Sequence, residues 1–220
     1  MQINIRPLTK HDLETYYRND WVLGKLSNLP RPLKSSDVWL EKIPAKRLMF
    51  DQLYHDLINS KSGKILDIGS GNTDLLPKVL SHLDVEFLDP AFEITNNQKF
   101  HRESWDRTLL LTNKFQYDVI TCNDLFPNVD NRIFKFLELV LPLTLKLRMT
   151  LTAHSSEKLY HLRKTDGEEL FWNAWDKDIL LYKLTRFFNI DIANNAFFNL
   201  ENSELFDDKR TVYLLEVSRE

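Results

Sequence analysis

The feature that most constrains this chain is a short apolar run followed at once by two glycines, within Lys64–Asp74. Residues 65–68 are apolar apart from one acid, as in a strand that is buried on both faces of a sheet. Gly69 and Gly71 allow a tight turn with positive φ and let a ligand approach the backbone closely. Apolar residues then recur at helical spacing through residues 75–80. The stretch predicts a strand, a glycine turn and a helix whose first N–H groups face a nucleotide-like ligand.

Two details narrow the kind of nucleotide. A dinucleotide-binding fingerprint has a third glycine three positions after the second, but this chain has Asp74 there, and it also lacks the Gly-Lys-Ser/Thr of a Walker loop. Asp67 lies inside the predicted strand, where a buried carboxylate is costly unless it is paired. A cationic ligand without phosphate would account for both acids. S-adenosylmethionine (SAM), which carries an ammonium and a sulfonium group, is such a ligand.

The stretch Asp67-Ile68-Gly69-Ser70-Gly71-Asn72-Thr73 resembles the first motif of the class I SAM-dependent methyltransferases, Asp/Glu-x-Gly-x-Gly-x-Gly, with a threonine in place of the last glycine. The resemblance covers about residues 60–220. It implies an α/β fold with a Rossmann-like sheet, mostly parallel with an antiparallel last strand.

The resemblance also implies SAM as the cofactor. Asp67 would hold the amino group of its methionyl part, directly or through a water. Gly69, Ser70 and Gly71 would lie against the cofactor.

A second acid follows at the spacing that nucleotide-binding α/β units use. Residues 85–88 read as a short strand, and Asp89 comes 18 positions after Gly71 (89 − 71). In such units an acid about 20 residues after the turn accepts hydrogen bonds from the ribose hydroxyls. Pro90 ends strand pairing and suits the loop at the strand end. We therefore expect two carboxylates at the ends of neighbouring strands, both on the cofactor.

Further candidates follow at the ends of the next two strands. By the resemblance, Glu103 or Ser104 would meet the adenine amino group and Trp105 would stack on the ring; the alternative is a surface tryptophan. Asn123 and Asp124 end the strand that begins near residue 117, which places them near the transferable methyl group. Their order, Asn-Asp-Leu-Phe-Pro, differs from the Asp/Asn-Pro-Pro-Tyr/Phe of nucleobase amino-methyltransferases, so a nucleobase amine is disfavoured as the acceptor.

A general base, if one is used, would be His154 or Asp124. His154 ends an alternating strand over residues 146–154, and a histidine can remove a proton from a hydroxyl near neutral pH. The alternative is a histidine that is merely exposed at the start of a loop. We expect no metal site, because no cluster of His, Cys or carboxylates has ligand spacing.

The remaining segments are read by their periodicity. Residues 1–60 are expected to be a helical extension beside a domain of residues 61–220, either as a lid or as cover for a sheet edge. The extension would contain a short helix near 12–17 and a longer one that Ser36 or Asp37 caps and Pro44 kinks or restarts. Its basic residues, read as a solvated face or as contacts to an anionic group, are Lys42, Lys46 and Arg47.

The C-terminal part is expected to hold one helix and two closing strands. Trp172 to Phe188 reads as the helix, and residues 188–192 and 211–217 read as the strands. Trp172 and Trp175 could border the acceptor site, with core packing as the alternative.

The composition limits the classes of binding partner and the cellular compartment that we expect. The net charge is −3, whereas duplex nucleic acid favours a basic footprint, so no nucleic-acid partner is expected. Cys122 is the only cysteine, which excludes an internal disulfide. The start lacks the apolar core of a signal peptide, and no window reaches the roughly 20 apolar residues of a membrane span. We therefore expect a cytoplasmic protein.

The sequence thus predicts a methyltransferase that moves a methyl group from SAM to a hydroxyl or amine of a small molecule. Residues 123–130, with the strand residues 148–152 after them, look similar to methyltransferases of bacterial surface-glycan clusters. This resemblance suggests a sugar or glycan precursor as the acceptor. Two alternatives stay open. One is an NAD(P)-dependent oxidoreductase, and the other is a non-catalytic relative that binds SAM or only a partner protein.

Overall fold

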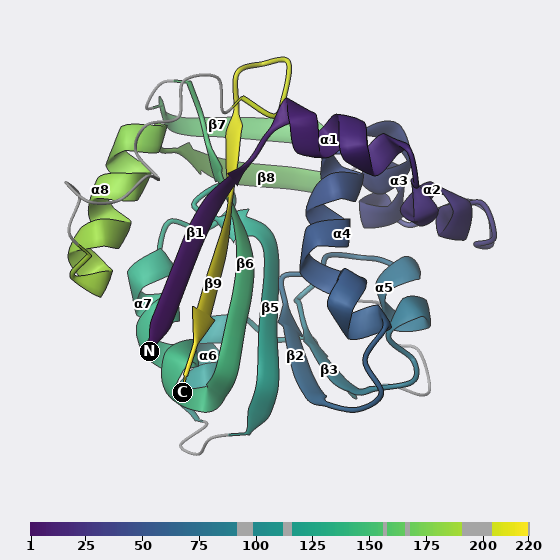
Figure 1. The fold of residues 1–220 in the computed structure, drawn as a ribbon, viewed down its shortest axis with the longest axis horizontal. Coiled ribbons are helices and arrows are strands. Elements are labelled where there is room, and N and C mark those ends of the chain that lie inside the picture. Colours follow the sequence, from purple (N-terminus) through teal and green to yellow (C-terminus); the bar gives the residue numbers. More distant parts are fainter. Residues whose placement is uncertain (92–98, 112–115, 156–157, 166–167, 191–203, 220) are drawn as a thin grey trace.

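The computed structural model describes all residues except 92–98, 112–115, 156–157, 166–167, 191–203 and 220. A seven-stranded sheet has the order β1-β9-β6-β5-β2-β3-β4, with helices on both sides (Figure 1). The sheet strands are β1 Gln2–Leu8, β2 Lys64–Ile68, β3 Asp84–Leu88, β4 Lys99–His101, β5 Tyr117–Phe126, β6 Thr144–Ala153 and β9 Thr211–Ser218. The helices are α1 Lys10–Tyr17, α2 Trp21–Leu26, α3 Ser35–Lys42, α4 Pro44–Ile58, α5 Leu75–Val79, α6 Trp105–Leu110, α7 Ile133–Val140 and α8 Lys177–Phe188, with a short 3₁₀ turn Leu141–Leu143.

Strand direction matches the expected fold class. β2, β3, β4, β5 and β6 run parallel to one another, and β9 runs antiparallel to β6. The chain passes from β2 outward to β3 and β4 and then returns to β5 on the other side of β2. In open α/β sheets, ligands bind beyond the carboxyl ends of the strands where this reversal occurs. A ligand site is therefore expected at the carboxyl ends of β2 and β5.

Two apolar clusters pack on the two faces of the sheet. One face is covered by α6, α7 and α8, with Leu109, Phe136 and Leu184 in the core. The other is covered by the N-terminal helices and α5, with Leu53 and Leu75 in the core. Such burial on both sides explains why residues 65–68 of β2 are apolar apart from Asp67.

The N-terminal residues form part of the sheet as well as helices. β1 pairs antiparallel with β9, and Ile5 lies opposite Leu215. α4 begins at Pro44, so this proline restarts the helix, and α4 contacts β5 and β6. The expected boundary at residue 60 therefore does not separate an extension from the sheet, because residues 2–8 supply its edge strand.

The C-terminal part differs from the expected single helix. Residues 172–174 belong to a strand, and α8 starts only at Lys177, where Asp176 accepts the N–H of Ile179. A two-stranded hairpin, β7 Lys158–Thr165 and β8 Glu168–Ala174, precedes it. The hairpin returns to the end of β6, where His154 bridges to Asp176.

The two expected closing strands have different outcomes. The strand over 211–217 is confirmed as β9. Phe188 instead ends α8, with Asn189 in the left-handed conformation after it. The rest of the expected 188–192 strand lies mostly outside the described residues. Within the described part of the chain, no helix is long and apolar enough to span a bilayer.

Candidate functional site

The glycine turn lies at the carboxyl end of β2 as predicted. Gly69 and Gly71 have φ of 78° and 68°, values that other residues rarely adopt. The N–H of Gly69 donates to the carbonyl of Leu88 at 3.0 Å, which ties the turn to the end of β3. A Cβ at Gly69 would lie 3.1 Å from Leu125, and a Cβ at Gly71 would lie 2.2 Å from the Oγ of Ser36. Side chains of β5 and α3 therefore pack against both glycines.

Asp67 is fully buried under this turn. Its Oδ2 accepts the hydroxyls of Tyr54 and Thr121, both at 2.6 Å, and its Oδ1 accepts the hydroxyl of Ser70. Burial raises the pKa of Asp67 from 3.8 to about 7, although the hydrogen bonds from Thr121 and Tyr54 oppose the rise and nearby Asp89 adds to it. Three hydroxyl groups therefore donate to Asp67, whereas the sequence led us to expect a cationic ligand as its partner. The bond from Ser70 connects this carboxylate to the glycine turn.

Asp89 lies just beyond β3 and is also buried. Its Oδ2 accepts the N–H of Gly71 at 2.8 Å, and its Oδ1 accepts the N–H of Ala91 at 2.7 Å. Pro90, between them, is exposed. The two acids predicted at neighbouring strand ends therefore both bind the same glycine turn.

Asp37 is a site residue whose role sequence reasoning missed. Its fully buried carboxylate accepts the hydroxyl of Thr73 at 2.6 Å and the N–H groups of Asp74 at 2.7 Å and Leu75 at 3.4 Å. Burial raises the pKa of Asp37, although the bonds from Thr73 and Asp74 lower it. Asp37 therefore caps α5 from another helix, whereas the sequence suggested a cap for its own helix. This corrects the expectation that the start of α5 offers its N–H groups to a ligand.

The same contact explains the departure from the family motif at position 73. Thr73 donates to Asp37 and accepts the N–H groups of Leu75 at 3.1 Å and Leu76 at 3.4 Å. A glycine could make neither bond. Lys34 pairs with Asp74 at 3.1 Å, and the N–H of Ser36 donates to the carbonyl of Asn72 at 3.0 Å. Residues 34–37 therefore contact the glycine turn through residues 72–74.

Asn72, between the second glycine and Thr73, has an unsatisfied group. Its Oδ1 is buried and has no hydrogen-bond partner among the residues that the structure describes. Buried polar atoms are nearly always paired. An unpaired oxygen beside a glycine turn indicates a place where a ligand donor would fit.

Asn123 and Asp124 lie at an irregularity near the end of β5, where the register with β6 shifts. Asp124 has a positive φ of 56°. Its N–H donates to Thr150 at 2.9 Å, and Thr150 donates to the Oδ1 of Asn123 at 2.7 Å. The carboxylate of Asp124 accepts the hydroxyl of Thr152 and the ammonium of Lys46.

His154 and Asp124, the two candidate bases, lie on one chain of hydrogen bonds. The Nδ2 of Asn128 lies 3.3 Å from Asp124 Oδ2, and its Oδ1 lies 3.4 Å from the Nε2 of His154. The N–H of His154 donates to the carbonyl of Trp175 at 2.8 Å. The sequence offered the two residues as alternatives, and the structure joins them through Asn128.

The residues proposed for the adenine side lie differently from the expectation. Trp105 is buried, packs edge-on against Phe126 and Phe136 at 5.7 and 5.4 Å, and its Nε1 donates to Asp130 at 3.0 Å. Its ring is therefore part of the core, and it is not a surface tryptophan. Glu103 and Ser104 are exposed just before α6; Thr108 donates to Glu103, and Ser104 donates to Asp106.

Two of the three basic residues of the N-terminal segment are not on a solvated face. Arg47 is buried and bonds Asp20 at 2.8 Å and the carbonyl of Leu40 at 2.8 Å. Lys46 points to Asp124, as described above. Trp175 packs at 6.4 Å on Phe134, which agrees with aromatic packing. The side chain of Trp172 lies outside the described residues.

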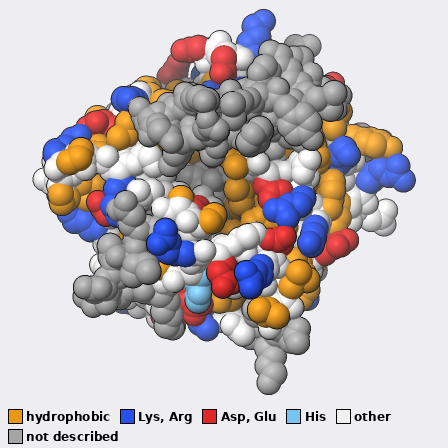
Figure 2. Space-filling model, turned by 180° about the vertical axis from the view of Figure 1, so that it is seen from behind, with side chains coloured by type: hydrophobic (Ala, Val, Ile, Leu, Met, Phe, Trp, Pro, Cys, Tyr) orange, Lys and Arg blue, Asp and Glu red, His pale blue; other side chains and the backbone are white. Residues whose placement is uncertain are grey.

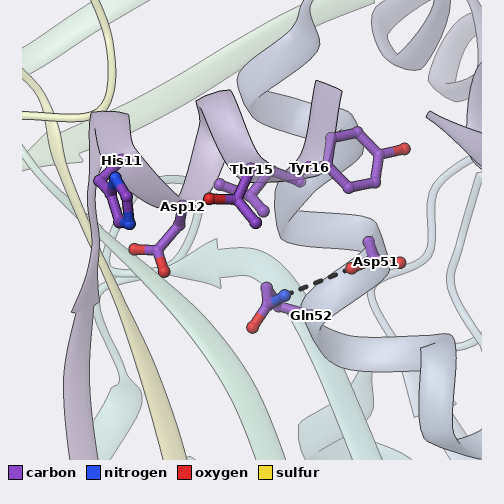
Figure 3. Close-up of a pocket in the computed structure, with 7 residues that line it drawn as sticks. His11, Asp12, Thr15, Tyr16, Asp51 and Gln52 are labelled. Carbon is purple, nitrogen blue, oxygen red and sulfur yellow. Dashed lines mark hydrogen bonds between the residues drawn. The ribbon is translucent and has the colours of Figure 1, made fainter. Parts of the chain in front are cut away.

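Other parts of the described surface do not contain the predicted site residues. A hollow of about 330 Å³ lies between α1 and α4, and it contains none of the predicted site residues (Figure 3). Its lining residues are His11, Asp12, Thr15, Tyr16, Leu48, Asp51 and Gln52. No group of three or more potential metal ligands occurs among the described residues. The face in Figure 2 is hollowed near its centre and carries described side chains of both charges, so it is not a uniformly basic surface.

Comparison with known proteins gives the fold but no sequence relative. Neither a protein-family profile nor a curated protein sequence matches the chain. Among solved structures, the DhpI–SAH complex is 14% identical, covers 96% of this chain and 98% of its own, and has a TM-score of 0.52. The DhpI–SAM–HEP complex is 14% identical over 94% and 99%, with a TM-score of 0.50. A Burkholderia thailandensis 1,6-didemethyltoxoflavin-N1-methyltransferase is 15% identical over 99% and 96%, with a TM-score of 0.49.

Likeness at this level of identity establishes the fold alone, and the strand order and direction agree with it. The chain has the Rossmann-like fold of the class I SAM-dependent methyltransferases.

Proposed function

We propose that this protein is a SAM-dependent methyltransferase that acts on a hydroxyl or amine of a small molecule. The observation that carries the proposal is the character of the glycine turn. Three acceptors lie at this turn: the carboxylates of Asp67 and Asp89 and the amide oxygen of Asn72. A ligand for such a place is a donor or a cation.

The contacts at the start of α5 favour SAM over a dinucleotide as the ligand. A pyrophosphate binds at a helix N-terminus because the first N–H groups point at it. Here the N–H groups of Asp74 and Leu75 already donate to the buried carboxylate of Asp37, and a phosphate beside that carboxylate would be repelled. SAM has no phosphate, so the residues present fit SAM and argue against the NAD(P)-dependent alternative.

The roles of the residues follow from these contacts. When bound, SAM supplies a methyl group on a positively charged sulfur. Asp89, which is ordered by Gly71 and Ala91, would accept hydrogen bonds from the ribose hydroxyls. Asp67 holds Ser70 and hence the turn, and its negative charge lies under a cationic ligand. Asn72 would accept a hydrogen bond from the ammonium group.

The proposal also includes the expected roles of residues 1–60, of the adenine-side residues and of the acceptor. Residues 1–60 would serve as the lid, since segment 34–37 contacts the glycine turn. Glu103, Ser104 and Pro90 are exposed, and they would contact the adenine side only when a ligand fills that edge. The proposal of a sugar or glycan precursor as the acceptor rests only on the resemblance of residues 123–130 and 148–152.

Titration calorimetry with SAM, S-adenosylhomocysteine and NADH tests the proposal. We expect the two sulfur ligands to bind and NADH not to bind. Asp89→Ala should weaken SAM binding at least about tenfold, which corresponds to ~1.4 kcal/mol. Glu138→Gln on the exposed side of α7 is the matched control and should bind as wild type does. Binding of NADH in place of SAM, or equal affinity in Asp89→Ala, would contradict the proposal.

Turnover decides between an enzyme and a non-catalytic relative. The protein would be incubated with methyl-labelled SAM and a panel of sugars, nucleotide sugars and small amines. Label transferred to a member of the panel is the expected result. Binding of SAM without transfer to any acceptor class, together with no automethylation, would favour the non-catalytic alternative.

A further inference from the structure

We propose that Tyr54 is a positioning residue for the cofactor, because its hydroxyl favours the ionised form of Asp67 under the glycine turn. The inference rests on the proposed function and deepens it, since it names the residue through which helix α4 acts on SAM binding. It depends on three hydroxyl groups that donate to the Asp67 carboxylate, from Tyr54, Thr121 and Ser70.

Asp67 acts on the turn from below and has no surface of its own there. Its exposed fraction is 0%, and both of its carboxylate oxygens accept hydroxyl groups. The bond to Oδ1 comes from Ser70, which lies between the two glycines of the turn. Asp67 therefore influences a ligand on the turn through the position of Ser70 and through its negative charge. A charge acts more strongly in a buried environment, where little water screens it.

The two hydroxyl groups that donate to Oδ2 of Asp67 come from different elements. Thr121 lies on β5 opposite Asp67 in the parallel pairing, so the sheet fixes its hydroxyl. Tyr54 comes from α4, is 1% exposed, and packs its ring on Phe50 at a centroid distance of 4.6 Å. Packing therefore fixes the Tyr54 hydroxyl before any ligand binds, and this hydroxyl links α4 to the acid under the turn.

The geometry of these bonds suits an ionised acid. Tyr54 and Thr121 both lie 2.6 Å from Oδ2 of Asp67, within the range of charge-assisted hydroxyl–carboxylate bonds. Three donors to one carboxyl group favour its ionised form, because a carboxylate only accepts, whereas a carboxylic acid has a proton of its own to place. Removal of one donor therefore favours the neutral form.

Titratable groups from three elements act on Asp67. Burial raises the pKa of Asp67 to about 7, although its hydroxyl donors lower it, and the negative charge of Asp89 after β3 raises it further. Burial also raises the pKa of Tyr54 on α4 and the pKa of Cys122 on β5 well above their ordinary values, with the charge of Asp67 as the next cause. Both groups are therefore neutral between pH 6 and 8.5, and neither adds a charge beside Asp67.

These contacts make the affinity for SAM depend on pH. A cation on the turn is bound more tightly above an ionised Asp67 than above a neutral one, so the affinity should rise with pH until Asp67 is fully ionised. In Tyr54→Phe, Asp67 has lost one donor and keeps its proton to a higher pH. The variant should therefore bind SAM less tightly than wild type mainly at low pH, whereas a loss of packing alone would weaken binding by the same factor at every pH.

A titration of the Asp67 carboxyl group tests the inference without a ligand. Nuclear magnetic resonance of the full-length protein with ¹³C-labelled aspartate follows the carboxyl signal that is lost in Asp67→Asn. In Tyr54→Phe we expect a midpoint about one pH unit above that of wild type. Thr121→Val, which removes the other donor to the same oxygen, should also raise the midpoint. A wild-type midpoint in Tyr54→Phe would overturn the proposal.

Tyr16→Phe is the matched control. Tyr16 is also a buried tyrosine of the N-terminal helices, and its hydroxyl donates to Asp20 at 2.7 Å. Asp20 caps α2 and is not part of the glycine turn. Both substitutions thus remove one buried hydroxyl that donates to an aspartate, but only Tyr54→Phe should change the Asp67 midpoint.

Calorimetry with SAM at pH 6 and at pH 8.5 tests the link to the cofactor. The dissociation constant of Tyr54→Phe is divided by that of wild type at each pH, which cancels the titration of the ligand's own amino group. We expect a ratio of about five to ten at pH 6 and below about two at pH 8.5. For Tyr16→Phe the ratio should stay near one. A Tyr54→Phe ratio that is the same at both pH values would overturn the proposal.

The proposed function and this inference fail in different ways. If wild type binds no SAM at either pH, the proposed function fails, and the carboxyl titration still decides whether Tyr54 governs the charge of Asp67. If wild type binds SAM but neither the midpoint nor the pH dependence of binding changes in Tyr54→Phe, only this inference fails.

Discussion

Asp67 combines full burial with three hydroxyl donors, from Tyr54, Thr121 and Ser70. The donors stabilise the ionised form, whereas burial favours the neutral one, and burial prevails in the pKa of about 7. A carboxyl group with such a pKa changes its charge within the physiological range. Its charge would then depend on whether a cation lies on the turn above it.

The raised pKa of Asp67 predicts a pH-dependent stability. The unfolded chain loses this proton near pH 4 and the native protein keeps it to about pH 7, so the contribution is complete at low pH and is lost as the pH rises between these values. At ~1.4 kcal/mol per pKa unit the change is on the order of 4 kcal/mol. Asp67→Asn should remove it. Urea unfolding from pH 4.5 to 8 measures the difference between wild type and variant.

The test uses the stability difference between wild type and Asp67→Asn, because other carboxyl groups also make the stability depend on pH. The raised pKa of Asp37 has an effect of the same sign as that of Asp67. The lowered pKa values of Asp106, Asp130 and Asp208 have an effect of the opposite sign. Glu138→Gln again serves as the control. A stability difference between wild type and Asp67→Asn that stays constant with pH, or grows as the pH rises, would show that the pKa of Asp67 is not raised.

Gly71 and Gly24 form a matched pair of residues. A Cβ at Gly71 would meet the Oγ of Ser36 at 2.2 Å on a backbone with φ of 68°, whereas a Cβ at Gly24, inside α2, would meet nothing within 4 Å. Gly71→Ala should therefore destabilise the protein by about 1–3 kcal/mol and weaken SAM binding. Gly24→Ala should stabilise it by about 0.5–1 kcal/mol. Thermal unfolding of both variants checks the opposite signs, and shifts in the same direction would refute this account.

At the scale of elements, α3 and α5 depend on each other. Asp37 lies in the first turn of α3, yet its carboxylate caps the first turn of α5 and orders Thr73. Helix α5 has only five residues, too few to be stable alone. The contact therefore stabilises the loop that carries the glycines, and it brings the N-terminal segment to the candidate site.

Removal of this cap should be costly. Asp37→Ala leaves the hydroxyl of Thr73 and the N–H of Asp74 without their acceptor and removes one of the two acceptors of the Leu75 N–H. We therefore expect a loss of about 2–4 kcal/mol of unfolding free energy. Asp37→Asn keeps one carbonyl oxygen and should lose about half as much. Urea unfolding ranks the two variants. An alanine variant within 0.5 kcal/mol of wild type, on the order of the scatter for surface changes, would mean that the cap contributes little.

At the scale of the whole molecule, the first eight residues complete the sheet. β1 pairs with β9 along its length and buries Leu8 fully. We therefore expect the chain to unfold as one cooperative unit that includes its first strand, although sequence patterns suggested a separate extension.

Leu8→Ala tests this unity. Deletion of a buried leucine side chain costs about 2–5 kcal/mol, and in a single unit the whole transition shifts. Circular dichroism and tryptophan fluorescence, with Trp21 and Trp39 before residue 60 and Trp105 after it, should report the same lowered midpoint. Two separate transitions, with only the N-terminal one displaced, would contradict a single unit.

The parts of the fold that local patterns specify were predictable. Strand β2, the glycine turn and the acid at the end of β3 follow from apolar runs, positive-φ glycines and a fixed spacing, all of which act over a few residues. The helix of α1 and the last strand were predictable for the same reason. The hairpin β7–β8 was missed because residues 172–174 were read as the start of a helix.

What the sequence alone determined is the parallel α/β core and the pair of acids at two adjacent strand ends, because hydrophobic period and turn chemistry are local. Only the tertiary structure decided what those acids touch. Asp37 reaches α5 across 36 to 38 positions and Lys46 reaches Asp124 across 78, and no spacing rule links such partners. Their pairing depends on how α3 and α4 pack over the sheet, which is a property of the assembled core.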